Sequence, residues 1–134
     1  MTDEERLLVV AAVAFLRDGK VLTVRKRGTD RFMLVGGKIE AGESPEQAAV
    51  REAHEEVGLV ASDLRALGRF SAAAANEPGH RVDSTVFTAV LTAEPVAAAE
   101  IEELRWMRLD DEHDDLAPLL VDHVLPLLRH RRGD

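Results

Sequence analysis

The chain has 134 residues, no cysteine and a formal net charge of −8 at pH 7. This length gives room for one core of useful size, so we expect a single domain over residues 1–134. Without cysteine there is neither a disulfide framework nor a thiolate zinc site, and the acidic balance argues against binding to a nucleic-acid polymer.

Two strands are predicted at the start of the chain, over residues 7–16 and 21–25. The Asp18-Gly19 pair between them is a strong hairpin signal. The apolar run LLVVAAVAFL is too short to cross a membrane and lacks the charged leader and cleavage site of a signal peptide, so a buried strand explains it better. We therefore expect no membrane partner and a cytoplasmic location.

The stretch of residues 17–31 carries six basic side chains and two acidic ones. In an acidic chain, a basic patch suits a phosphorylated small molecule as ligand, although solubilising charges on strand edges and turns would give the same composition. Arg25 and Arg27 alternate along the second predicted strand, so both lie on one face of it. That face is expected to be cationic.

A short strand over residues 32–35 is predicted to lead into Gly36 and Gly37. This pair lets the backbone approach a phosphate closely, because no side chain intervenes and a positive φ is available. An ordinary tight turn is the alternative interpretation of the pair.

A helix is predicted from about residue 45. Ser44 is a good N-cap, Pro45 suits the first helical position, and Gln47 completes a capping box with Ser44. Gly58 stands at the usual position of a helix C-cap. Both ends of this helix are therefore specified by local signals.

Three glutamates of this helix, Glu52, Glu55 and Glu56, share one helical face because of their spacing. They lie beside the apolar stripe, so we expect them at the rim of a core. If the three glutamates instead formed a solvent-exposed acidic face, the repulsion within each pair would cost only a few tenths of a kcal/mol. Magnesium, however, prefers hard oxygen ligands and binds one or two carboxylates together with substrate phosphates. The pattern beside a glycine pair favours such a cation site.

Three further strands are predicted over residues 64–74, 82–92 and 103–109, with a loop of small residues at 93–99 before the last of them. A final amphipathic helix is predicted over residues 116–129, with Asp114 or Asp115 as its cap. Pro126 is expected to kink this helix or to end its regular part.

The segment GKIEAGESPEQAAVREAHEEVGL, from Gly37 to Leu59, has one long pattern of fixed positions. It resembles the signature of the Nudix hydrolases at every specified position. The resemblance implies an α/β/α sandwich with a mixed β-sheet. It also implies hydrolysis of a nucleoside diphosphate linked to another group, with Mg²⁺ or Mn²⁺ as cofactor.

The resemblance assigns roles position by position. It implies that Glu52, Glu55 and Glu56 are metal ligands, that the Gly37 carbonyl is a further one, and that Arg51 and Glu43 orient them. In MutT-type nucleoside triphosphate pyrophosphohydrolases, a glutamate placed like Glu100, six residues before Trp106, joins the metal site as a ligand or general base. Glu102 and Glu103 are the alternatives to it. The expected substrate contacts are Arg25, Arg27, Gly36, Gly37 and Lys38.

Residues 36–59 are especially similar to the MutT-type subgroup. This implies cleavage of a nucleoside triphosphate, modified or oxidised ones included, to the monophosphate and pyrophosphate. ADP-ribose or nucleotide sugars are alternative substrates, and a non-catalytic nucleotide-binding regulatory domain is the alternative of another class. The retained glutamates favour the enzyme, acting on a nucleotide as monomer or homodimer.

Two positions depart from this subgroup. Val35 stands where proline usually precedes the paired glycines. The start of the last predicted helix has only aliphatic side chains where an amide that reads the base is expected. Those residues are Leu116, Ala117, Leu119 and Leu120.

Overall fold

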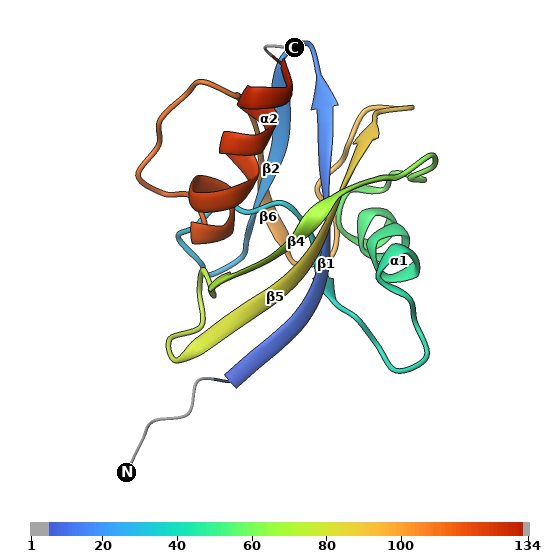
Figure 1. Cartoon of the computed structure of the whole chain (residues 1–134). Coiled ribbons are helices and arrows are strands. Elements are labelled where there is room, and N and C mark those ends of the chain that lie inside the picture. The colour runs from blue at the N-terminus through green and yellow to red at the C-terminus, as the bar shows by residue number, and fades with distance from the viewer. Residues whose placement is uncertain (1–5, 133–134) are drawn as a thin grey trace.

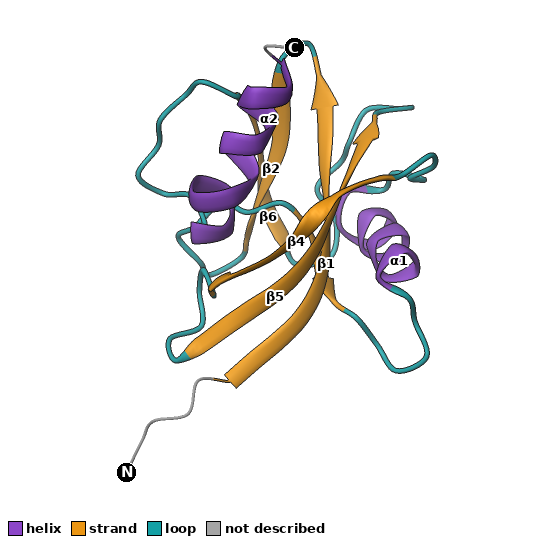
Figure 2. Cartoon of the chain, viewed as in Figure 1, coloured by secondary structure: helices purple, strands orange, loops and turns teal. Residues whose placement is uncertain are grey.

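The structure is a computed structural model that describes residues 6–132, so residues 1–5 and 133–134 of the expected domain lie outside the described residues. Helix α1 (Pro45–Val57) covers one face of a mixed sheet, and the π-helical turn η1 (Leu120–Val124) with helix α2 (Leu125–Arg132) covers the other (Figures 1 and 2). The predicted α/β/α sandwich is confirmed. The strands are β1 (Arg6–Arg17), β2 (Lys20–Lys26), β3 (Val35–Lys38), β4 (Arg65–Ala73), β5 (His80–Val90) and β6 (Ile101–Arg108).

The sheet has the order β4-β5-β1-β2-β6, with β3 paired to β1 outside this path. Strands β1 and β5 are parallel, whereas the other pairs are antiparallel. The middle of β1, from Val10 to Val13, pairs with β3, and the last residues of β1 pair with β2. Strands β3 and β2 thus pair with successive segments of β1. Functional groups can lie at the point where these two strands separate.

The local signals of the first hairpin and of α1 are confirmed. Asp18 and Gly19 both have positive φ, at 52° and 75°, as a tight hairpin requires. Ser44 accepts a hydrogen bond from the backbone of Gln47, whose side chain accepts one from the Ser44 backbone, which completes the capping box. Gly58 ends α1 in the left-handed conformation.

The glycine pair is not a turn, and the strand predicted over residues 32–35 is wrong. Gly36 and Gly37 lie inside β3, and neither has a positive φ. Phe32 and Met33 make only isolated bridges. A Cβ at Gly36 would collide with the carbonyl oxygen of Ala11, so glycine is needed here for close strand packing and not for an unusual φ.

This collision gives a stability prediction. Gly36→Ala is expected to lower the free energy of unfolding by about 2–3 kcal/mol, since β3 must move away from β1 to make room. Urea denaturation measures this as a lower midpoint with an unchanged slope. A midpoint equal to that of the parent protein would contradict the prediction.

The last helix starts later than residue 116. Leu116 bridges to Phe32, and the Ala117 N–H donates to the Phe32 carbonyl at 2.8 Å, so both residues are fixed to the loop before β3. Asp115 does not cap the helix, because its carboxylate binds Arg105 at 2.7 and 3.0 Å. Residues 118–132 are continuously helical, and the π-helical turn η1 lies directly before Pro126, which is the interruption of regular geometry expected at this proline.

The other strands lie within two residues of their predicted bounds. Strands β5 and β6 each begin two residues before the predicted start, at His80 and Ile101. Strand β5 lies between β4 and β1, which explains its apolar residues on both faces.

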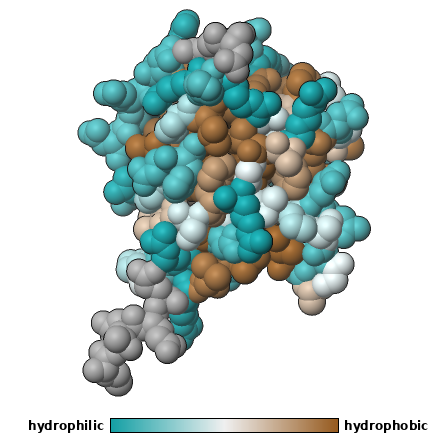
Figure 3. All heavy atoms as spheres, viewed as in Figure 1, coloured by the Kyte–Doolittle hydropathy of each residue, from teal (hydrophilic) through white to brown (hydrophobic). Residues whose placement is uncertain are grey.

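Each face of the sheet has its own apolar core. The core below α1 contains Val13, Phe15, Leu22, Ala53 and Val57, among others, and the core below α2 contains Ala12, Val21, Val86, Leu120 and Val124. Figure 3 shows apolar atoms gathered in the middle of the viewed face, with hydrophilic residues around them. Within residues 6–132, no helix has the length and apolarity that spanning a membrane requires.

Candidate active site

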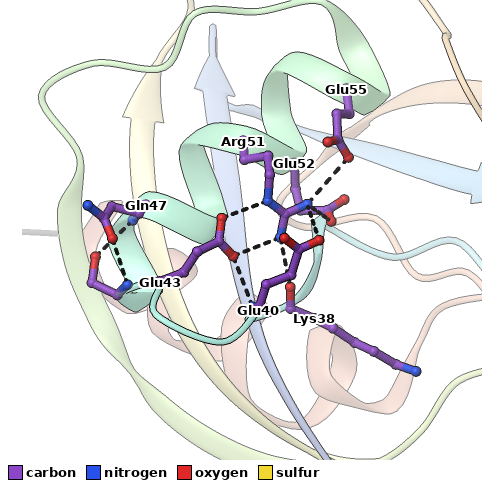
Figure 4. Close-up of polar contacts among 8 residues, drawn as sticks. Lys38, Glu40, Glu43, Gln47, Arg51, Glu52 and Glu55 are labelled. Carbon is purple, nitrogen blue, oxygen red and sulfur yellow. Dashed lines mark hydrogen bonds and ion pairs between the residues drawn. The ribbon is translucent and has the colours of Figure 1, made fainter.

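The guanidinium of Arg51 is the centre of a carboxylate network at the surface of α1 (Figure 4). It donates two hydrogen bonds to Glu43, from Nε at 2.7 Å and from Nη2 at 2.9 Å. Its Nη1 lies 2.7 Å from Glu52 Oε1 and 3.4 Å from Glu55 Oε2, and its Nη2 donates to the Lys38 carbonyl at 3.0 Å. The pairing with Arg51 lowers the pKa of Glu43 to about 2. Arg51 and Glu43 therefore form a fixed, charged support next to the other glutamates.

Glu56 is buried, with 2% of its surface exposed, so the expectation that it lies at the rim of the core is wrong. Its Oε1 accepts a hydrogen bond from the Gly36 N–H at 3.1 Å, whereas its Oε2 has no partner among the described residues. Burial raises the pKa of Glu56 to about 8, against the opposing effects of the Gly36 N–H and of Lys26. Burial therefore favours the neutral form of this carboxyl group in the free protein.

Glu52 lies directly over Gly37. A Cβ at Gly37 would come within 2.6 Å of the Glu52 carboxyl carbon, so the carboxylate occupies space that only glycine leaves open. Through Gly36 and Gly37, strand β3 thus contacts both Glu56 and Glu52. Glu55 is the most exposed of the three helix glutamates, with 51% of its side chain accessible.

Lys26, at the end of β2, faces this group of carboxylates. Its Nζ lies 3.2 Å from Glu100 Oε1. Burial lowers the pKa of Lys26, but the carboxylates of Glu56, Glu100 and Glu52 outweigh burial and leave the pKa raised. Lys26 is therefore a positively charged group in direct reach of the site.

Sequence reasoning missed Lys26 because strand alternation selected its neighbours. Arg25 donates to Glu103 at 3.1 Å and to the Thr29 carbonyl at 2.9 Å, and Arg27 approaches Glu102 at 3.4 Å. The pairing of β2 with β6 shifts register between Arg25 and Lys26, which changes the direction of the side chains at this point. The only signal in the sequence was the basic stretch itself.

Their ion-pair partners distinguish the three candidate glutamates, Glu100, Glu102 and Glu103. Glu103 binds Arg25 of β2 and Glu102 binds Arg27 just after it, whereas Glu100 binds Lys26 and acts on the pKa of Glu56. The side chain of Lys38 points away from Arg51, and only its carbonyl takes part in the network (Figure 4). The structure thus brings Glu100 to the helix glutamates and leaves Arg25, Arg27 and the Lys38 ammonium outside the cluster.

The donor set fits a hard divalent cation. Within residues 6–132, no three acidic or histidine side chains already converge as a metal site. A guanidinium nitrogen of Arg51 nevertheless lies between Glu52 and Glu55 and bridges them, as a cation does. Glu56 adds an unpaired, buried carboxyl oxygen, and carboxylate oxygens are the ligands that Mg²⁺ prefers.

A cavity of about 240 Å³ begins at Gly36 and Gly37 and extends over the sheet face covered by η1 and α2. Its walls are largely apolar or small side chains, among them Val10, Ala12, Met33, Val82, Ala117 and Leu120. Ala117, Leu119 and Leu120, at the start of the last helical segment, line the cavity and offer no amide, whereas Leu116 does not line it. Polar groups come instead from Ser84 on β5 and from Asn76 in the β4–β5 loop, both of which sequence reasoning passed over.

Comparisons with known proteins show the family of the chain. The family model for the NUDIX domain matches residues 6–128. An ADP-ribose pyrophosphatase from Methanocaldococcus jannaschii is 30% identical over 110 residues, which cover 80% of this chain and 63% of that protein. An 8-oxo-dGTP diphosphatase from Haemophilus influenzae is 39% identical over 72 residues, which cover 51% of this chain and 53% of that protein. In both cases the chain spans less than two thirds of the relative.

A solved structure described as a MutT NUDIX hydrolase, from Burkholderia pseudomallei, has the same fold. It superposes with a TM-score of 0.75 at 26% identity, and the superposition covers 93% of this chain and 98% of that one.

Proposed function

The chain belongs to the Nudix family, and we propose that it is a metal-dependent pyrophosphohydrolase that cleaves a nucleoside triphosphate, modified or oxidised ones included, to the monophosphate and pyrophosphate. One observation carries this proposal. The glutamates of α1 and the apolar cavity meet at the same two residues, Gly36 and Gly37. A molecule with phosphates at one end and a flat, largely apolar group at the other fits that arrangement.

The proposed metal ligands are Glu52, Glu55 and Glu56, with the Gly37 carbonyl and Glu100 as further ligands. When bound, Mg²⁺ or Mn²⁺ neutralises phosphate charge and lowers the pKa of the attacking water. Water attacks phosphorus, the bond to the pyrophosphate oxygen breaks, and one proton is released.

The remaining residues of the site act on orientation and charge. Arg51, held by Glu43, fixes the carboxylates of Glu52 and Glu55. Lys26 stands between the carboxylates and the cavity, where it binds a phosphate oxygen of the substrate. In place of a ligand role, Glu100 is exposed enough to act as the general base that accepts the proton of the attacking water.

ADP-ribose and nucleotide sugars are the alternatives to a nucleoside triphosphate among small molecules. The named activity of the Methanocaldococcus jannaschii relative favours ADP-ribose, and that of the Haemophilus influenzae relative favours a nucleoside triphosphate. The volume of about 240 Å³ lies below the usual range for sites that enclose a drug-sized ligand, which favours a single base in the cavity. The net charge of −8 supports a small nucleotide over a polymer.

The test is a screen for pyrophosphate and phosphate release with Mg²⁺ and with Mn²⁺. It includes unmodified and oxidised nucleoside triphosphates, ADP-ribose, nucleotide sugars and an RNA oligonucleotide with a 5′-triphosphate. We expect pyrophosphate from at least one nucleoside triphosphate. Turnover of ADP-ribose alone would replace the substrate class, and binding of nucleotides without any turnover would favour a regulatory domain.

The contact between Gly37 and Glu52 gives a second prediction. Gly37→Ala is expected to lower kcat/KM about a hundredfold, since it displaces the Glu52 carboxylate by about 1 Å. The obstructing atoms belong to a side chain and not to the backbone, so the melting temperature should change little. Gly36→Ala, which meets backbone, is the matched contrast. Full activity of Gly37→Ala would show that Glu52 is not part of the active site.

A further inference from the structure

Ser84 lines the cavity, on strand β5, which lies between β4 and β1 in the sheet. It is 0% exposed, and its Oγ has no hydrogen-bond partner among the described residues. On either side it has Val10 of β1 and Phe70 of β4 as register partners. A buried hydroxyl without a partner is unfavourable in the free protein, so its presence needs an explanation.

The other polar side chains around the cavity are all more accessible. Lys26, Thr29 and Asn76 are half-buried, and Glu77 is exposed. They surround the cavity where it opens, whereas Ser84 lies among apolar residues such as Val82 and Ala12. Ser84 is therefore the fully buried polar group that a ligand in this cavity meets.

The strand register sets how far Ser84 lies from the glutamates. Val10 of β1 is paired with Ser84 on one side and with Lys38 on the other. Ser84 is thus two strand spacings, about 10 Å, from the β3 segment that carries Gly37. The phosphates of a nucleotide at Gly37 leave its sugar and base to occupy the cavity toward Ser84.

We propose that Ser84 is a specificity-determining residue, whose hydroxyl forms a hydrogen bond with a ring nitrogen or carbonyl oxygen of the substrate's base. This inference rests on the proposed function and narrows it to phosphate compounds that carry a heterocyclic base. A hydroxyl both donates and accepts hydrogen bonds, and it can rotate about χ1. The group that is unpaired in the free protein becomes paired in the complex.

The test compares substrate binding with stability, because Ser84→Ala should weaken binding without lowering stability. Ser84→Ala should raise KM for the preferred nucleoside triphosphate about three- to tenfold, the loss of one hydrogen bond, with kcat little changed. KM for ribose 5-triphosphate, which has no base, should stay the same. The melting temperature of the free protein should stay or rise, because an unpaired buried hydroxyl has been removed. A purely structural serine would lower stability and affect both substrates alike.

Two further variants act as controls. Thr88→Val removes a hydroxyl from the same strand outside this cavity and should leave both KM values unchanged. Ser84→Cys keeps a group of similar shape with a weak donor, and should fall between serine and alanine. Equal KM values for the parent protein and Ser84→Ala with every base, or equal losses with ribose 5-triphosphate, would overturn the inference.

Failure of the proposed function gives a different result. In that case the parent protein hydrolyses no substrate, and calorimetric binding of a nucleoside 5′-monophosphate still tests Ser84. Weaker binding to Ser84→Ala then supports the role of the hydroxyl, and equal binding to both proteins overturns it.

Discussion

Glu56→Gln should abolish hydrolysis and yet stabilise the free protein at pH 8. The carboxylate of Glu56 is a proposed metal ligand, and an amide is a much weaker ligand for Mg²⁺, so kcat/KM should fall at least about a hundredfold. The stabilisation has a separate cause, namely the burial of an ionisable group. The two effects therefore have opposite signs in one variant.

The pH dependence follows from the pKa of Glu56. It is about 8 in the folded protein, against 4.5 for an unperturbed glutamate, so folding takes up a proton between these pH values. The stability that this group contributes is complete below pH 4.5 and is lost as the pH rises through 8. The slope approaches about 1.4 kcal/mol per pH unit in that window. Glutamine imitates the protonated carboxyl group and should remove this slope.

The measurement is urea denaturation at pH 5, 6, 7 and 8 in the presence of a chelator. The free energy of unfolding of the parent protein should fall over this series more steeply than that of Glu56→Gln. Glu46→Gln changes an exposed glutamate in the first turn of the same helix and should match the parent in both activity and slope. Parallel pH profiles for the parent and Glu56→Gln would show that Glu56 is ionised in the folded protein.

The features of α1 could be predicted because their causes are local. The Ser44 capping box, the Gly58 cap and the glutamate spacing each depend on residues within one or two helical turns. The degree of burial of Glu56 could not be predicted in this way. It is set by strand β3, which packs the Gly36 N–H against the carboxyl group from 20 residues away.

Errors in the sequence-based prediction arise where distant segments meet. The bridge between Phe32 and Leu116 fixes two loops that are 84 residues apart, and it delays the start of the last helix. The place of Gly36 inside a strand depends on the approach of Ala11, which no local pattern reveals. In the sequence Ser84 is one of several residues on a strand face, and only the cavity distinguishes it from the others. Substrate selection is therefore the part of the function that local patterns describe least.

Lys26, and not Arg25 or Arg27, is the basic group beside the carboxylates of the site. We expect Lys26→Met to raise KM for the substrate about ten- to a hundredfold, since a hydrogen bond to a charged group contributes about 1.5–3 kcal/mol. Its loss also leaves the carboxylates of Glu100 and Glu56 without their nearest ammonium, so kcat should fall as well. Lys26→Arg keeps the charge and should recover part of the activity.

Matched variants distinguish Lys26 from the neighbouring arginines as the group that binds the substrate. Arg25→Met breaks a pair with Glu103 and should change KM less than threefold, because that pair is partly exposed and lies away from the cluster. Lys20→Met removes a charge from the other end of the strand and should have no effect on KM. A larger rise of KM in Arg25→Met than in Lys26→Met would show that the substrate binds the face with Arg25 and Arg27, as strand alternation predicts. Equal activity of Lys26→Met and the parent would leave the phosphates to the metal and the backbone of β3 alone.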